Sequence, residues 1–305
     1  MVCMLNRYLA TFLVCLHLIG TSALADDSGL QSSEPEVPQR LVSTDGSLTE
    51  IVYALGYGSH LVGVDTTSTY PREAKALPQI GYKRALSVEG VMSLMPDMVL
   101  TTDDSGPAIV IDQLKQAGIK LQNYSAAPEL ASVKEKILGV SEQLGIPDQG
   151  KALWAQVLTQ IESAMNRPLP EKPAKVLFVL SFSDRSPMVA GSETVAHLMI
   201  NLAGGVNAAS GFDGFKPISA EALVEMAPDV VLMMEGRNPQ VTSDTLFLKP
   251  GFNQTPAASD QRLITMDGMM LLGLGPRTGL AIDSLNKALY SGQALVSAKS
   301  GLADD

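Results

Sequence analysis

Cysteine is almost absent from this chain, which has only Cys3 and Cys15. Both lie within residues 1–25, where Arg7, an apolar run and the small residues Ala-Leu-Ala form the pattern of a cleavable export signal. We expect the exported chain to have no disulfide, no lipid-bearing cysteine, no cysteine-held metal cluster and no cysteine nucleophile. The apolar run is shorter than the roughly 20 residues of a membrane span, so a soluble exported protein is favoured over a retained anchor.

Basic residues and histidines are also few. Without Arg7, 21 basic residues stand against 32 acidic ones, a net charge of −11, and there is no basic run. Nucleic acid and anionic lipid are therefore poor partners, and direct membrane insertion is not expected. Beyond residue 25 the histidines are His60 and His197, which do not form a ligand-spaced cluster.

The common enzyme motifs are missing as well. The chain has no G-x-S-x-G, no Walker loop, no G-x-G-x-x-G that opens a helix and no H-E-x-x-H. The glycine-rich stretch GLGPRTG at 273–279 lacks the Lys-Ser/Thr of a phosphate-binding loop and is read as a turn. A binding protein is favoured over an enzyme.

The first half of the chain has the rhythm of an α/β lobe. Residues 26–38 are polar and rich in Pro and Ser, which predicts a flexible arm. From residue 39 to 146, β-rich runs (RLVST, HLVGV, DMVLTT, IKLQNY) alternate with helical patterns, which predicts a parallel sheet. Ser47, with Glu50 three residues later, predicts a helix start, and Gly56 predicts its end.

The second half repeats this rhythm after a long helix. Apolar residues at helical spacing from about 148 to 166, followed by RPLPEKP, predict a linking helix at 147–168. A second α/β lobe is expected at 174–298. The predicted fold is two Rossmann-like α/β lobes joined by a single long helix, with a ligand cleft between the lobes.

One segment recurs residue by residue. LSVEGVMSLMPDMVL (86–100) aligns without gaps on ISAEALVEMAPDVVL (218–232), with Ser, Glu, Pro, Asp, Val and Leu identical. Each copy predicts a Ser cap, a helix of about two turns, a Pro-Asp turn and a buried strand. Glu89 and Glu221 would lie in the first turns of the two helices, where the helix dipole favours negative charge.

The stretch GYKRALS (81–87) places Tyr82 two residues before Arg84. In an extended segment the two side chains point the same way, about 6.6 Å apart. The guanidinium would lower a phenol pKa that is normally near 10, and a phenolate suits ferric iron. Alternatively, Tyr82 packs at a lobe rim and Arg84 pairs with an acidic neighbour. The second copy has GFKPIS, with Phe215 and Pro217 in these places, so the polar pair is found in one lobe only.

Two further segments bear on a binding site. Residues 266–279 provide an apolar wall, followed by Arg277, which could face a carboxylate; the wall residues of interest are Met269, Met270 and Leu272. Tyr70 also stands two residues before an arginine, Arg72, and is a rival to Tyr82. The proline between them makes extended geometry less regular, so Tyr82 ranks first.

Over residues 39 to about 292 the chain resembles the periplasmic haem-binding proteins of bacterial haem-uptake ABC transporters. These are a branch of a two-lobe solute-binding family that also includes carriers of vitamin B12 and ferric siderophores. The resemblance is carried by RLVSTDGSLTEIVYALG, LVGVDTTS, AGSETVAHLMINLAGG, ISAEALVEMAPDVVLMME and MMLLGLGPRTG, and the haem branch by GYKRALSVEG. It implies that Tyr82 is the axial ligand of ferric haem iron and Arg84 its hydrogen-bonding partner. It also implies that Glu89 and Glu221 meet arginines of the permease. His197 cannot be matched to the histidine that some members use for a further haem, so a sixth ligand stays open.

The resemblance implies a monomeric periplasmic protein that binds haem, performs no catalysis and delivers its cargo to an inner-membrane ABC permease. The nearest alternative keeps the fold and carries a corrinoid or a ferric siderophore. A tetrapyrrole or metal enzyme such as a chelatase would need a paired His/Glu metal site in the cleft. A plain adhesion or scaffold protein would bind no small molecule.

Overall fold

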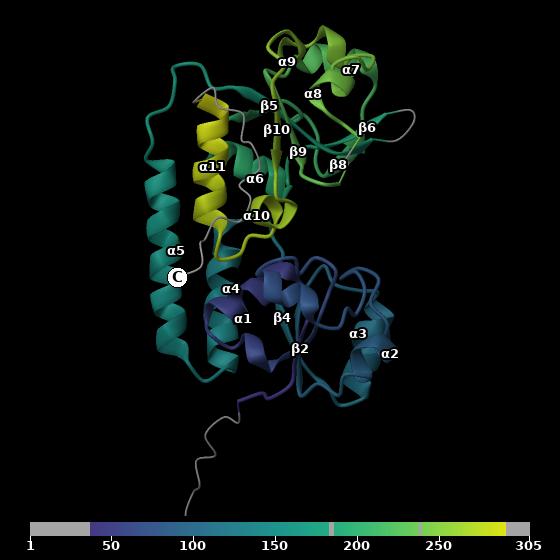
Figure 1. Ribbon diagram of the computed structural model, residues 1–305, viewed down its shortest axis with the longest axis vertical. Coiled ribbons are helices and arrows are strands. Elements are labelled where there is room, and N and C mark those ends of the chain that lie inside the picture. The colour runs from purple at the N-terminus through teal and green to yellow at the C-terminus, as the bar shows by residue number, and fades with distance from the viewer. Residues whose placement is uncertain (1–36, 183–185, 238–239, 291–305) are drawn as a thin grey trace, which may run out of the picture. The chain divides into compact units, whose positions relative to one another are not determined.

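The computed structural model describes residues 37–182, 186–237 and 240–290 (Figure 1). These residues belong to one compact unit, which begins at Glu36. The predicted export signal (1–25), most of the predicted arm (26–38) and the part of the second lobe beyond residue 290 lie outside the described residues.

The first lobe is built on a four-stranded parallel sheet in the order β2-β1-β3-β4. Its strands are β1 (Leu41–Ser43), β2 (Leu61–Val64), β3 (Met98–Thr102) and β4 (Lys120–Tyr124). Its helices are α1 (Gly46–Ala54), α2 (Val88–Met92), α3 (Ala108–Gln116) and α4 (Leu130–Gln143), with short 3-10 turns at Gly58–His60 and Arg72–Ala76. Strands β1 and β3 are buried throughout, as expected of a parallel sheet covered on both faces. The parallel α/β rhythm predicted for this part of the chain is confirmed.

The second lobe has a six-stranded mixed sheet, with the path β10-β9-β5-β6-β8 and β7 beside β5. Its strands are β5 (Lys175–Phe182), β6 (Pro187–Ala190), β7 (Val206–Asn207), β8 (Phe215–Pro217), β9 (Val230–Met234) and β10 (Leu263–Met266). Its helices are α6 (Val195–Leu202), α7 (Ala220–Met226), α8 (Ser243–Leu246), α9 (Pro256–Ser259), α10 (Gly268–Leu272) and α11 (Thr278–Tyr290), with a 3-10 turn at Phe252–Gln254.

The antiparallel edge of this sheet is a feature that the repeated rhythm did not predict. Strand β6 runs antiparallel to both β5 and β8. The link between β5 and β6 spans only residues 183–186, which is too short for the crossover that a parallel pair requires. Strand β8, which begins at Phe215, is therefore the outermost strand at this edge of the sheet.

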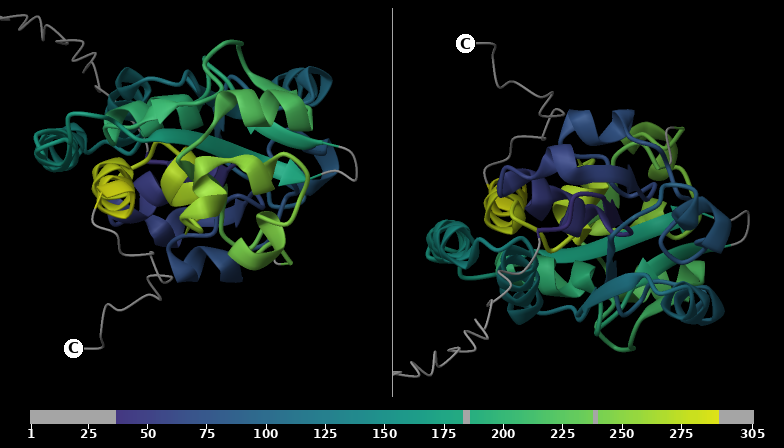
Figure 2. Two further views of the ribbon diagram at one scale, coloured as in Figure 1. Left: turned by 90° about the horizontal axis from the view of Figure 1, so that it is seen from above. Right: turned by 90° about the horizontal axis from the view of Figure 1, so that it is seen from below.

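Helix α5 (Pro147–Met165) connects the lobes, within the range of 147–168 predicted for the linking helix. Pro147 occupies the first turn, where its missing N–H costs no hydrogen bond. Figure 2 shows α5 and α11 end-on and side by side, and they approach closely at Gly279, where a Cβ would lie 2.6 Å from the Cβ of Gln160. Val157 and Ile161 of α5 are buried in a core that also contains residues from both sheets. The lobes therefore share one continuous apolar core.

The helix starts test the capping predictions. Ser87 and Ser219 cap α2 and α7, accepting the N–H groups of Gly90 and Ala222, which confirms both predicted caps. The prediction for Ser47 is wrong, because Asp45 caps α1 and accepts the Ser47 N–H at 2.8 Å.

The cap of α1 is an acidic residue two positions before Ser47, so the helix begins earlier than expected. Ser47 lies in its first turn, and its hydroxyl donates to the same Asp45 carboxylate. Gly56, with φ of 80°, follows the helix as predicted and takes the left-handed conformation that favours glycine.

Asp65, just after β2, is a buried carboxylic acid with an unbalanced set of partners. Its Oδ1 accepts hydrogen bonds from the Thr67 and Ser68 hydroxyls, whereas Oδ2 has no hydrogen-bond partner, and the residue is 0% exposed. Burial raises the pKa of this carboxyl from 3.8 to about 6, and the nearby charge of Asp45 adds to the increase. Between about pH 4 and about pH 6 the folded protein therefore holds a proton on Asp65 that the unfolded chain has lost.

We expect Asp65→Asn to change how stability depends on pH. Because the folded pKa is raised, the wild type loses stability as the pH rises from about 4 through about 6, and the neutral amide does not. The free energy of unfolding of the variant, relative to wild type, should rise by up to about 3 kcal/mol between about pH 4 and about pH 8. Urea denaturation across this range measures the difference, with the exposed Asp112→Asn as a control. A pH-independent difference would contradict the assignment.

Candidate functional site

A cavity of about 970 Å³ lies between the lobes, at the upper end of the range for small-molecule pockets. The first lobe contributes the polar residues Asp45 after β1, Thr67 after β2 and Asp104 after β3, and the small apolar Ala126 lines the cavity after β4. The carboxyl ends of parallel strands meet at one edge of the sheet, which is where α/β proteins bind their ligands. The topology of the first lobe thus places these polar groups together.

Tyr82 and Arg84 both line this cavity, in a conformation that differs from the prediction. The segment is a turn and not extended, because the Ala85 N–H donates to the Tyr82 carbonyl at 2.7 Å. The two side chains still interact. A hydrogen bond to Asp104 is the main cause of a raised pKa of the Arg84 guanidinium, and the Tyr82 side chain contributes to it. Tyr82 is 44% exposed, so its ring is accessible in the cavity.

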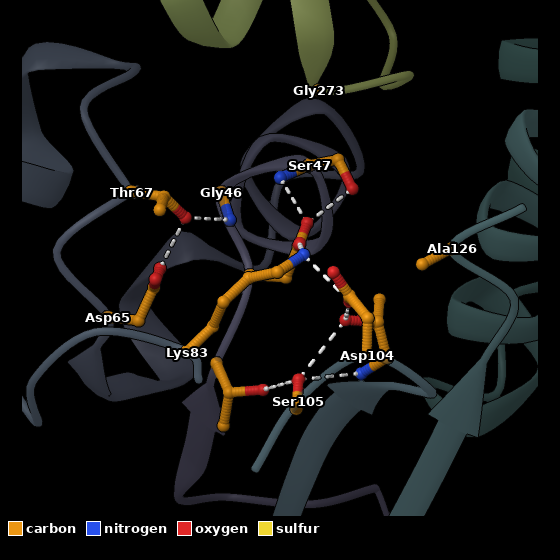
Figure 3. A network of polar contacts seen from close by, with 12 residues as sticks. Gly46, Ser47, Asp65, Thr67, Lys83, Asp104, Ser105, Ala126 and Gly273 are labelled. Atoms are coloured by element: carbon orange, nitrogen blue, oxygen red, sulfur yellow. Dashed lines mark hydrogen bonds and ion pairs between the residues drawn. The ribbon is translucent and has the colours of Figure 1, made fainter. Parts of the chain in front are cut away.

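An ionic network holds this turn in place (Figure 3). The Lys83 ammonium lies 2.7 Å from Asp45 Oδ2 and 2.8 Å from Asp104 Oδ1. The other Asp104 oxygen, Oδ2, lies 2.7 Å from the Arg84 guanidinium. Arg84 therefore pairs with an acidic neighbour, as the second sequence interpretation proposed, and also interacts with Tyr82. Sequence reasoning missed Lys83 and both acids, although the position of Asp45 and Asp104 after predicted strands was a usable signal.

The network is charged at neutral pH. Burial opposes ionisation of Asp45, but Lys83 and Lys136 lower its pKa to about 2. Burial likewise opposes ionisation of Asp104, and Lys83 and Arg84 nevertheless hold its pKa below the usual value. For Lys83, burial favours the neutral amine, yet Asp45 and Asp104 raise the pKa of the ammonium. The first-lobe side of the cavity is thus a set of paired charges.

Two cations, the buried Lys136 and the largely buried Arg277, connect the lobes beside the cavity. Lys136 of α4 is 3% exposed and donates to the Ser47 hydroxyl at 2.9 Å and to the Gly273 carbonyl of the second lobe at 3.3 Å. Arg277 binds both carboxylate oxygens of Glu50, at 2.9 and 2.6 Å. This bidentate pair is nearly buried and joins the start of α11 to α1.

These contacts bear on two predicted ligand contacts. Arg277 was expected to face a ligand carboxylate, but its carboxylate partners are Glu50 and, at 3.4 Å, Asp267, and it does not line the cavity. The guanidinium also lies 4.0 Å from the ring centre of Tyr70, which likewise does not line the cavity. Of the two tyrosines considered, only Tyr82 faces the space between the lobes.

The second lobe contributes a mostly apolar wall. Met269 and Leu272 of α10 line the cavity as predicted, whereas Met270 packs against the core and does not line it. Phe215, the counterpart of Tyr82 in the repeat, lines the cavity too and is also 44% exposed. Met188 lies near Phe215, because β6 pairs with β8 in a register that puts both side chains on one face. Sequence analysis had not singled out Met188.

The remaining candidates lie away from the cavity. Glu89 and Glu221 are exposed in the first turns of α2 and α7. His197 is half-buried between the side-chain amides of Asn201 and Asn207, at 2.9 and 3.3 Å. Within the described ranges, no group of three or more His, Cys, Asp or Glu is arranged to hold a metal ion. In the same part of the chain, no helix has the length and apolar character of a membrane span.

We expect Arg277→Met to destabilise the protein by about 3 to 5 kcal/mol, because it leaves the buried Glu50 carboxylate without its charge partner. Glu50→Gln combined with Arg277→Met should recover much of this loss. Urea denaturation of both variants measures the effect, and Arg72→Met is a control at an exposed arginine. A change within about 0.5 kcal/mol for Arg277→Met would contradict a stabilising role for the pair.

Comparison with known proteins agrees with this architecture. Residues 41–269 match the family model described as periplasmic binding protein. Among solved structures, the periplasmic haem-binding protein RhuT from Roseiflexus sp. RS-1 in its apo form is 40% identical, with a TM-score of 0.80 over 83% of this chain and 98% of that one.

Curated relatives are more distant. YvrC of Bacillus subtilis (strain 168), an ABC transporter substrate-binding lipoprotein, is 28% identical over 83% of this chain and 80% of its own length. The vitamin B12-binding protein of Vibrio vulnificus (strain CMCP6) is 25% identical over 81% of this chain and 88% of its own length. These relatives are substrate-binding proteins, and the matches extend across both lobes. The chain therefore belongs to the periplasmic binding protein family.

Proposed function

We propose that this protein binds ferric haem in the cavity between its lobes and presents it to an ABC permease of the inner membrane. The observation that carries the proposal is the position of Tyr82, whose accessible ring lines a large cavity beside a guanidinium. The higher identity to a haem-binding protein than to a vitamin B12-binding protein favours haem over a corrinoid.

The chemistry of Tyr82 suits ferric iron. A phenolate oxygen is a hard anionic ligand, and tyrosine serves as an axial ligand of haem iron in other proteins. Arg84 would contribute to the charge balance of the iron-bound oxygen, because a cation stabilises negative charge nearby. Ligation by Tyr82 would therefore select ferric over ferrous haem.

The second lobe provides the apolar contacts that a porphyrin requires. Phe215, Met269 and Leu272 would cover its faces, and most of the affinity would come from burying this flat apolar surface in a largely preformed cavity. The iron bond would add orientation. Met270 and Arg277 would not contact the porphyrin, because neither lines the cavity.

The setting of the proposed function is the periplasm. The predicted export signal would bring a monomeric carrier there, and as a member of the periplasmic binding protein family it would carry its ligand without a catalytic step. Glu89 and Glu221, one on each lobe and both exposed, would dock on basic residues of the permease. The net charge of −11 would help to steer the carrier toward such a basic surface.

Loss of the Tyr82 hydroxyl alone should weaken haem binding. Tyr82→Phe keeps the ring and removes the proposed iron ligand, so hemin affinity should fall at least about tenfold and the phenolate-to-iron charge-transfer band should disappear. Hemin titration followed by visible absorption measures both. Tyr70→Phe is the matched control, since that ring packs under Arg277 outside the cavity.

Each outcome of this titration has a distinct meaning. If wild type does not bind hemin saturably, the haem proposal fails, and titration with a corrinoid tests the nearest alternative on the same fold. If Tyr82→Phe binds as wild type does, haem is the cargo but Tyr82 is not its ligand.

The docking proposal predicts that substitutions at Glu89 and Glu221 impair haem transfer to the permease without changing haem binding. Glu89→Lys with Glu221→Lys should leave hemin affinity unchanged, since both residues lie away from the cavity, and should lower haem transfer to the permease several-fold. Growth on haem as the iron source, or ATPase stimulation of the reconstituted transporter, measures delivery. The exposed pair Glu129→Lys and Glu171→Lys provides a control with the same change of charge. Equal delivery by the two double variants would contradict docking through Glu89 and Glu221.

A further inference from the structure

Arg84 depends on other residues for its orientation. Its side chain is 60% exposed, and a long exposed arginine samples many rotamers unless a partner fixes it. The partner here is Asp104, whose Oδ2 lies 2.7 Å from the guanidinium. The position of the guanidinium in the cavity that Tyr82 also lines therefore depends on this carboxylate.

Asp104 is itself held firmly. Its Oδ1 accepts hydrogen bonds from the Lys83 ammonium at 2.8 Å and from the Thr102 hydroxyl at 2.8 Å, and Thr102 is buried at the end of β3. Its side chain is 27% exposed, less than half the exposure of Arg84. A well-ordered carboxylate can fix a mobile guanidinium through a charge-assisted hydrogen bond.

The backbone joins the same two segments. The Gly106 N–H donates to the Lys83 carbonyl at 2.8 Å, and the Leu86 N–H donates to the Gly106 carbonyl at 2.9 Å. The loop after β3 thus lies against the Tyr82 turn through both main chain and side chains. Loss of the Asp104 charge should leave this backbone frame intact and release the guanidinium, while Lys83 keeps its ion pair with Asp45.

We propose that Asp104 is a positioning residue of the haem site: bound to Lys83 and Arg84 together, it holds the guanidinium beside the Tyr82 oxygen. This inference rests on the proposed haem function. It assigns to Asp104 an effect on haem retention that passes through Arg84 and needs no contact with iron.

A double-mutant cycle separates this role from a purely structural one. The variants are Arg84→Ala, Asp104→Asn and the double variant, and the measurement is the rate of hemin release to a haem-scavenging apoprotein in excess. Asp104→Asn should release hemin about tenfold faster than wild type, and Arg84→Ala at least as fast. Because Asp104 acts through Arg84, the double variant should exceed Arg84→Ala by no more than about twofold.

Asp103→Asn is the matched control. Asp103 is the exposed neighbour, and its Oδ1 accepts the Ala126 N–H at 3.0 Å, a role that an asparagine oxygen can keep. Its hemin release and its charge-transfer band should match wild type. The band of Asp104→Asn should shift in the same direction as that of Arg84→Ala.

The proposal would be overturned if the increase in hemin release in the double variant equalled the product of the increases in the two single variants. It would also be overturned if Asp104→Asn released hemin at the wild-type rate. If wild type binds no hemin, the proposed function fails first, which is a separate result. If thermal denaturation shows that Asp104→Asn folds poorly, Thr102→Val is used in its place, since it removes the hydroxyl that donates to Asp104. Hemin release should then be faster in Thr102→Val than in wild type. The same substitution added to Arg84→Ala should leave the release rate of Arg84→Ala unchanged. Unchanged release from Thr102→Val in the wild-type background would overturn the proposal in that case.

Discussion

The arrangement of the cavity and the polar connection between the two lobes both depend on the hydrogen bonds and ion pair of the Asp45 carboxylate. It caps α1, accepts the Ser47 hydroxyl and binds Lys83, which lies between Tyr82 and Arg84. The Ser47 hydroxyl in turn accepts from Lys136, and Lys136 reaches the Gly273 carbonyl of the second lobe. A single buried charge thus connects a helix start, the Tyr82 turn and the opposite lobe.

The two lobes show how a repeated segment can acquire different chemistry. Both copies keep the Ser cap, the short helix and the buried strand. They differ just before the cap, where the first lobe forms a turn and the second forms strand β8 at an antiparallel edge. Tyr82 and Phe215 consequently enter the same cavity from different backbone conformations. The first lobe presents mainly polar and charged groups, and the second presents a mostly apolar wall.

Local patterns allowed much of the fold and part of the site to be predicted from sequence. The caps at Ser87 and Ser219, the linking helix and the strands of the first lobe depend on residues close together in the chain. The ionic contacts do not: Lys83 is 38 residues from Asp45, and Arg277 is 227 residues from Glu50. No spacing rule pairs such residues, so Arg277 was assigned to a ligand while its partner was a glutamate of the other lobe.

The shared core of the lobes has a consequence for turnover of the protein. Apolar residues of both sheets, α5 and α11 form one continuous cluster, so a loss of packing within this cluster exposes residues of both lobes. Cleavage of the segments in this cluster by proteases would require an opening that involves both lobes. Any ligand that binds the native state lowers the population of that open form throughout the chain, including segments far from the cavity. The lifetime of the protein would thereby report whether it is loaded.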